Sequence, residues 1–237
     1  MCNGSIMDKL ISFSLPLMLS GILQLMFNAV DIIVVGRFSG KQALAAVGST
    51  TALINVFTNL FIGISLGANV LAARFYAMGK SKEMSETVHT SITLAMVSGV
   101  IMAFVGVLFA RGALELMGTP DDVIDQSTLY MRIYFLGMPA MALYNFGNAV
   151  CSAFGDTKKP LYYLGAAGIV NIVLNLFFVI VCKMDVAGVA TASIISQYLS
   201  AFLILRALVK VGGDYALRLS KLRFDKRMAG YLIQIGL

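Results

Sequence analysis

Six long stretches of this chain contain no charged residue, apart from one carboxylate in the first. They cover 10–36, 42–73, 87–110, 133–155, 160–182 and 186–205. Each reaches the ~20 apolar residues that a helix needs to cross a bilayer. Only 13% of the 237 residues are charged, against about 25% in soluble domains. The stretches lack the apolar–polar alternation of a membrane β-barrel. We therefore predict an all-α integral membrane protein, a bundle of six transmembrane helices.

The six helices are expected to form one unit, with the last residues outside it. We predict helices at about 10–36, 44–72, 88–110, 129–154, 161–182 and 187–208. Residues 1–209 would form a transmembrane lobe, and the basic segment 210–237 a cytoplasmic linker. Leu10–Leu15 and Leu232–Leu237 share the pattern Leu-Ile-x-apolar-small-Leu. Many transporters consist of two related halves, so we expect the second copy of this pattern to begin a second lobe beyond this sequence.

The distribution of Lys and Arg predicts the orientation in the membrane. With the amino terminus inside, the segments on the inner side hold 13 of the 18 basic residues and those on the outer side hold 5. Basic residues accumulate on the cytoplasmic side of membranes. Both termini are therefore expected in the cytoplasm, with the protein in the cell (inner) membrane as a multi-pass protein. The net charge of +6 follows from this asymmetry, and no nucleic-acid partner is predicted.

The sequence offers little material for catalysis. His89 is the one histidine, and it is expected at the cytoplasmic start of a helix. Cys2, Cys151 and Cys182 show neither disulfide nor metal spacing. The apolar stretches contain no Ser–His or His–carboxylate arrangement. We predict no enzyme activity and no catalytic residue.

Asp31 is the one charged residue between Leu10 and Gly36. A charge at membrane depth costs about 2.5–3.5 kcal/mol, so such a residue indicates a functional site. The alternative is that Asp31 lies near a helix end and reaches interfacial water. Ser20, Gln24 and Asn28 precede it at helical spacing and form one polar stripe. The stripe faces either a cavity or a hydrogen-bonding seam between helices, and the carboxylate favours the cavity.

Other polar residues could complete a site. Asn171 and Asn175 share one face of the fifth predicted helix, and their amide oxygens suit a hard cation such as Na⁺ or a seam between helices. The sixth predicted helix offers the hydroxyls of Thr191 and Ser193. Tyr144 and Asn148 lie on the fourth, where the tyrosine could bind an aromatic cation or belong to an interfacial belt. Gly63-x-x-x-Gly67 on the second predicts a packing groove.

These residues resemble the multidrug and toxic compound extrusion (MATE) family of secondary transporters over essentially the whole chain. Pro16, Gln24, Asn28, Asp31 and Gly36 are similar to the family's first-helix signature. The segment 152–161, SAFGDTKKPL, resembles its loop between helices four and five. Asn171 and Asn175 resemble the family's fifth helix, and residues 188–193 resemble its sixth helix.

The resemblance implies one lobe of a two-lobe, twelve-helix antiporter that exports drugs or organic cations in exchange for Na⁺ or H⁺. It implies a cation-coupling site of Asp31, Asn171, Asn175 and Ser193, with Thr191 as an alternative hydroxyl. Asp31, Asn171 and Asn175 would be the ligands if the ion is Na⁺, and no other cofactor is implied. Gln24, Asn28, Pro16, Tyr144 and Asn148 would line the cavity. The partners would be the drug, the lipid bilayer and either a carboxy-terminal lobe or a second copy.

One departure from the family concerns the coupling site, because Asn175 stands where many members have Asp. Asp31 alone would then balance the ion, and the sequence leaves Na⁺ and H⁺ both open. Two other functions stay open. A flippase for lipid-linked oligosaccharides, from the same superfamily, would need basic residues in the cavity, and the apolar stretches have no Lys or Arg. An inactive lobe or membrane scaffold would show neither ion-dependent drug binding nor dimerisation.

Overall fold

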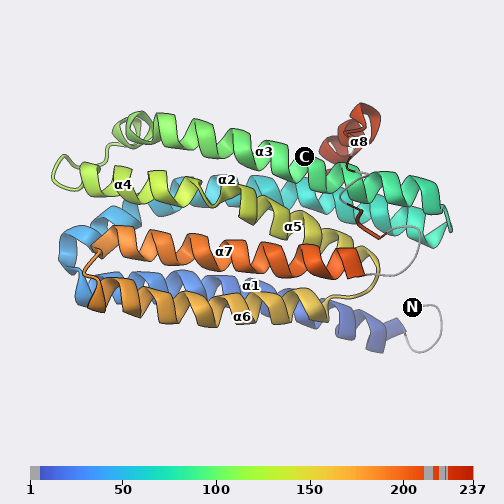
Figure 1. Ribbon diagram of the computed structural model, residues 1–237, viewed down its shortest axis with the longest axis horizontal. Helices are drawn as coiled ribbons and strands as arrows, with labels where there is room; N and C mark the ends of the chain where they lie inside the picture. Colours follow the sequence, from blue (N-terminus) through green and yellow to red (C-terminus); the bar gives the residue numbers. More distant parts are fainter. Residues whose placement is uncertain (1–5, 211–215, 219–221, 223, 237) are drawn as a thin grey trace.

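The computed structural model describes residues 6–210, 216–218, 222 and 224–236, and within them the chain is helical without a strand. Five helices are long and apolar enough to cross a membrane. The elements are α1 (Ile6–Phe38), α2 (Gly40–Ala77), α3 (Ser81–Leu116), α4 (Ile124–Phe135), α5 (Met138–Ala153), α6 (Lys158–Leu176), the π-helical turn η1 (Phe177–Val181), α7 (Asp185–Lys210) and α8 (Lys226–Gly236). Figure 1 shows α1 to α7 side by side along one long axis.

The helix predicted at 129–154 is divided into two helices, α4 and α5. The division lies at Leu136 and Gly137, whose N–H groups turn back to the carbonyls of Ile133 and Tyr134 at 3.0 and 2.9 Å. Pro139 follows, and it has no N–H to donate to the carbonyl of residue 135. The break is therefore local, and α4 and α5 together occupy the range of the fourth predicted helix.

The end of the fifth predicted helix also has an irregular form. After Leu176 the chain widens into η1, where the N–H of Cys182 bonds the carbonyl of Phe177 at 3.1 Å. Lys183 and Asp185 then adopt positive φ angles of 53° and 46°, and α7 begins. Such π-helical turns often mark functional sites, and this one begins two residues after Asn175.

Helix α5 lies at the centre of the bundle, between α2, α3 and α7 (Figure 1). Its residues are almost all buried and, with Phe146 among them, form the main core together with the rings of Phe61 and Phe135. A second core, mostly of aliphatic side chains, joins α1, α2, α4, η1 and α7 around Val35, Val47 and Val189. The outer faces stay apolar: Leu25 is 70% exposed and Phe104 67%. Exposed aliphatic faces on long helices fit contact with lipid.

The segment after α7 is attached to the bundle at several points. The imidazole of His89 receives the N–H of Arg218 on Nε2 at 3.1 Å, and its Nδ1 lies 2.7 Å from the carbonyl of Ser85. Nδ1 therefore carries the proton. Leu217 is 1% exposed, and α8 packs on α2. His89 lies in the third turn of α3, near the helix start where the sequence predicted it.

Part of the sequence prediction falls outside the described residues. These include Cys2, Lys221, Arg223 and Leu237, the last residue of the internal repeat, and the side chain of Lys9. The division into a lobe of residues 1–209 and a linker of residues 210–237 stays a prediction.

Candidate functional site

Asp31 lies inside the bundle, where α1 faces α6 and α7. Its side chain is 6% exposed. Oδ1 accepts a hydrogen bond from the amide of Asn175 on α6, and Oδ2 accepts one from the hydroxyl of Ser193 on α7 at 3.0 Å. This burial excludes the alternative in which interfacial water solvates the carboxylate. Donors from two other helices take the place of that water.

The amides around Asp31 form a connected network. Asn175 Nδ2 also donates to Asn171 Oδ1 at 3.1 Å, and Asn171 Nδ2 donates to Ser193 Oγ at 3.4 Å. Asn175 is 0% exposed, and its own Oδ1 has no hydrogen-bond partner among the described residues. The network therefore contains one carboxylate and one buried amide oxygen with unused acceptor capacity.

Local sequence explains why these groups meet. Asn171 and Asn175 are one turn apart, so both face α1 and α7. Gly168 lies one turn earlier, and a Cβ atom at that position would overlap the ring of Phe27. The missing side chain lets α1 approach α6 closely. The glycine on α6 and the aromatic on α1 together hold Asp31 opposite the two amides.

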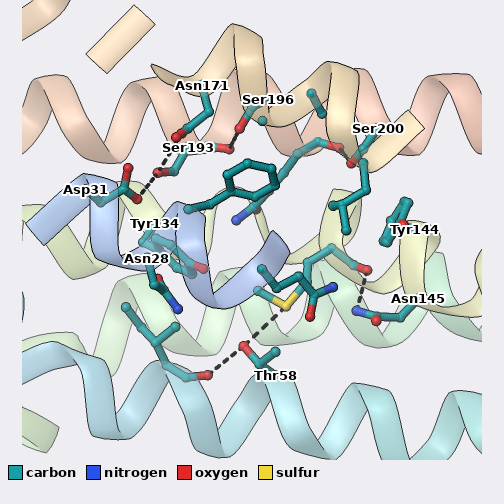
Figure 2. Close-up of a pocket in the computed structure, with 18 residues that line it drawn as sticks. Asn28, Asp31, Thr58, Tyr134, Tyr144, Asn145, Asn171, Ser193, Ser196 and Ser200 are labelled. Carbon is teal, nitrogen blue, oxygen red and sulfur yellow. Dashed lines mark hydrogen bonds between the residues drawn. The ribbon is translucent and has the colours of Figure 1, made fainter. Parts of the chain in front are cut away.

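A cavity of about 160 Å³ extends from Asp31 between α1, α2, α4, α5, α6 and α7 (Figure 2). Asp31 is its one charged lining residue in the described part of the chain. Its other lining residues are amides, hydroxyls, aromatic rings and aliphatic groups: Gln24, Phe27, Asn28, Ile54, Thr58, Tyr134, Met141, Tyr144, Asn145, Leu164, Ala167, Gly168, Asn171, Ser193, Ser196, Gln197 and Ser200. A cavity of one acid with aromatic, Met and amide walls suits a lipophilic cation.

The structure brings most of the predicted site residues together. Asp31, Asn171, Asn175 and Ser193 form the network, and Gln24, Asn28 and Tyr144 line the cavity. Tyr144 also donates its hydroxyl to the carbonyl of Pro160 at 3.1 Å.

Three predicted residues lie outside the network and the cavity lining. The hydroxyl of Thr191 donates to the carbonyl of Ala187 at 2.7 Å, because two residues before Ser193 the helix has turned by about 200°. Pro16 lies two turns before Gln24, roughly 12 Å along α1. Asn148 lies one turn beyond Tyr144, where it accepts a hydrogen bond from Ser152.

Sequence reasoning also missed lining residues. Phe27, Thr58, Tyr134 and Met141 were not assigned to the cavity. A usable signal existed on α7, where Ser193, Ser196, Gln197 and Ser200 follow helical spacing. No comparable sequence pattern indicated Phe27, because an aromatic residue in an apolar helix is usually interpreted as a core residue or a lipid contact.

Metal-ligand clusters of the usual kind do not occur in the part of the chain that the structure describes. No group of three or more His, Cys, Asp or Glu side chains comes together there. An ion at Asp31 would thus be held by one carboxylate with neutral amide and hydroxyl oxygens. This donor set fits Na⁺ or H⁺ better than a transition metal.

Comparison with known proteins gives a consistent family. The model of the MatE family matches residues 16–177. A Bacillus subtilis protein named "Probable multidrug resistance protein YoeA" is 34% identical over 224 residues, which are 93% of this chain and 47% of that protein. "Probable multidrug resistance protein NorM" of Thermotoga maritima is 26% identical over 86% of this chain and 45% of its own length. The chain thus spans about half the length of the curated relatives it matches.

Solved structures show the same fold. The "Crystal structure of MATE in the bent conformation" superposes with a TM-score of 0.91 at 21% identity, covering 98% of this chain and 52% of that one. A MOP superfamily transporter from Pyrococcus furiosus, described as having a binding pocket of reversed polarity, gives a TM-score of 0.88 at 21% identity. It is again about half covered, at 52%. Each match corresponds to one lobe of a two-lobe fold.

Proposed function

The chain belongs to the MatE family as its amino-terminal lobe, and we propose that it acts in a cation-coupled antiporter that exports drugs or organic cations. One observation carries the proposal. The one carboxylate that lines the cavity in the described structure is bonded to α6 through Asn175 and to α7 through Ser193. A change of charge on Asp31 therefore acts on three helices at once.

The mechanism follows from the hydrogen bonds of the carboxylate. An ionised Asp31 accepts from Asn175 and Ser193, and removing either donor would leave a buried charge with less compensation. A proton on Asp31 turns one oxygen into a donor that needs an acceptor. The unused Oδ1 of Asn175 becomes that acceptor if the amide rotates. Protonation would thus exchange the partners of Asn175 and alter the contact between α1 and α6.

Sodium would act on the same groups. Na⁺, as the transported counter-ion, would be held by the carboxylate of Asp31 and the amide oxygens of Asn175 and Asn171. Either ion neutralises the acid, and an organic cation in the cavity would compete for the same negative charge. Loss of this attraction on binding of the ion would favour release of the drug.

The decisive experiment measures efflux of a lipophilic cation by the whole transporter carrying Asp31→Asn. We expect at least a tenfold loss of ion-driven efflux with normal insertion into the membrane. Asp122→Asn, an exposed acid before α4, is the matched control and should leave efflux unchanged. Efflux by Asp31→Asn that is unchanged and still ion-dependent would refute the assignment.

The flippase alternative is disfavoured by the cavity lining. Recognition of a pyrophosphate would need Lys or Arg, and neither is found among the described residues that line the cavity. An inactive lobe or scaffold predicts no ion-dependent drug binding. Displacement of a bound fluorescent cation by Na⁺ or by protons would exclude that role.

We further propose that both termini lie in the cytoplasm of the cell and that a second lobe completes the transport path. Cys182, in the exposed connection between α6 and α7, would then face outward. A membrane-impermeant maleimide applied to intact cells should label the protein, and Cys182→Ser should lose that label. Labelling of Cys182 only after lysis would reverse the orientation.

A further inference from the structure

A second cavity, of about 410 Å³, lies at the start of α6, between the loop that joins α5 to α6 and the first turns of α1. Ser12 and Phe13 of α1 and residues 154–158 line it. No residue lines both this cavity and the one at Asp31. Ser12 and Asp31 are roughly 28 Å apart along α1. The function proposed above therefore leaves this cavity without a role.

Thr157 is the buried polar side chain of this cavity. It is 3% exposed, and its hydroxyl makes no hydrogen bond within the described chain. Buried hydroxyls are nearly always bonded to protein, water or a ligand. A threonine directly before a helix usually caps that helix, but here the carboxylate of Asp156 accepts the N–H of Lys159 at 3.2 Å. The hydroxyl of Thr157 is thus available to a ligand in the cavity.

The charges at the cavity leave one ammonium group without a partner. Asp156 Oδ2 lies 2.6 Å from Lys159 Nζ, so these two charges neutralise each other. Lys158 is exposed and forms no ion pair with a described residue. Asp8, the acid in the first turn of α1, is not part of the lining. A hydroxyl, an ammonium group and the positive end of a helix dipole together suit a phosphate group.

The surroundings of the cavity indicate that this phosphate belongs to a lipid. Lys158 begins a face of α6 on which Tyr162 and Ile169 follow at helical spacing, and all three are exposed. Helix α1 packs beside α6 (Figure 1) and exposes Ile11 and Leu15 in the turns that line the cavity. Tyrosine is common where a membrane changes from polar to apolar. Acyl chains would lie against these faces, whereas a soluble phosphate ion would contact neither.

We propose that this cavity binds the phosphate of an anionic membrane phospholipid. Thr157 donates its hydroxyl to the phosphate, Lys158 supplies the opposite charge, and the acyl chains lie along the exposed faces of α1 and α6. Basic pockets between transmembrane helices bind anionic headgroups on the cytoplasmic side. Only the placement in the inner leaflet rests on the orientation proposed above. A lipid bound here would join the ends of the two helices that Asp31 and Asn175 connect further along.

Lipid binding to the purified whole transporter tests the site. Native mass spectrometry in detergent measures the apparent affinity for phosphatidylglycerol, an anionic phospholipid. We expect Lys158→Gln and Thr157→Val each to lower this affinity at least fivefold, and Lys158→Arg to keep it. Lys82→Gln is the matched control, because Lys82 is an exposed lysine without an ion pair to a described residue, at the same end of the bundle (Figure 1). Equal losses for Lys82→Gln and Lys158→Gln would overturn the proposal, since the attraction would then be diffuse.

Two further measurements separate a lipid from a soluble anion and binding from structure. Inorganic phosphate in large excess should not displace the lipid, and displacement would overturn the assignment to a lipid. In detergent without lipid, Thr157→Val should keep the melting temperature of the wild type, because the hydroxyl has no partner in the described chain. A lower melting temperature would overturn the role of this hydroxyl as a ligand donor. None of these measurements depends on transport, so they keep their meaning if the antiport proposed for Asp31 fails.

Discussion

The two ends of the cavity contain similar small polar residues and use them differently (Figure 2). At the Asp31 end, side chains bond to side chains on other helices: α1 to α6, α1 to α7 and α6 to α7. At the Ser200 end, Asn145 donates to the carbonyl of Met141 at 3.0 Å and Ser200 to that of Gln197 at 2.8 Å, each within its own helix. Only the first end can transmit a change of charge from one helix to another.

The same residue types therefore make different hydrogen bonds at the two ends of the cavity. Asparagine and serine at the Ser200 end are satisfied by their own backbone, which leaves them as a polar wall for a ligand. At the Asp31 end three of the bonds join two helices each, so the loss of one of them should loosen the contact between those helices. Three substitutions test this difference, each with a matched partner.

The largest effect on stability is expected from Asn175→Leu. The change removes two hydrogen bonds between side chains and leaves the buried Asp31 without one of its donors. Loss of one partner of a buried charge is expected to reduce the free energy of unfolding by roughly 3 kcal/mol. Asn145→Leu, the partner at the other end, should reduce it by about 1 kcal/mol, since it removes one bond within a helix.

Unfolding in detergent micelles, followed by circular dichroism, checks this prediction. Equal losses for Asn175→Leu and Asn145→Leu would erase the distinction between the two ends of the cavity.

A smaller effect is expected from Gly168→Ala. The added methyl group overlaps the ring of Phe27 and separates α1 from α6, at an expected loss of roughly 1–3 kcal/mol for overpacking. Gly165→Ala, three residues earlier on α6, meets nothing within 4 Å and should be neutral or slightly stabilising. The melting temperatures of the two variants give the comparison. The double variant Gly168→Ala with Phe27→Leu should recover part of the loss, and a Gly168→Ala variant as stable as Gly165→Ala would contradict the packing argument.

The sequence predicted the class of fold and most of the residues at the Asp31 end. Length and apolarity of the six stretches were sufficient for an all-helical membrane lobe, because only helices and barrels satisfy their backbone in lipid. Asp31 was identified because a charge inside a membrane costs free energy. Asn171 and Asn175 were identified because they lie one helical turn apart. The family resemblance placed these three and Ser193 at one site, and the structure shows them in contact.

Features that depend on how helices contact one another could not be predicted from the sequence in the same way. The break between α4 and α5 depends on which carbonyls the amides of Leu136 and Gly137 find. The role of Gly168 depends on an aromatic ring from another helix. Thr191 and Ser193 are equally good hydroxyls in sequence, and only the rotation of α7 decides which one faces Asp31. Periodicity assigns residues to a face but does not say which helix that face meets.

The smallest difference expected within a pair is that between Ser193→Ala and Ser200→Ala on the same helix. Ser193 donates to Asp31 and receives a bond from Asn171, so its loss weakens two contacts between helices. A hydrogen bond to a charged group contributes about 1.5–3 kcal/mol, and a neutral bond within a helix about 0.5–1.5 kcal/mol at most. Ser200→Ala replaces a hydroxyl bonded to its own helix and should therefore change stability by less. Ser193→Ala should also lower the apparent affinity for the coupling ion severalfold, whereas Ser200→Ala leaves it unchanged. If both variants changed the affinity for the coupling ion by the same factor, the distinction between the Asp31 end and the Ser200 end of the cavity would be wrong.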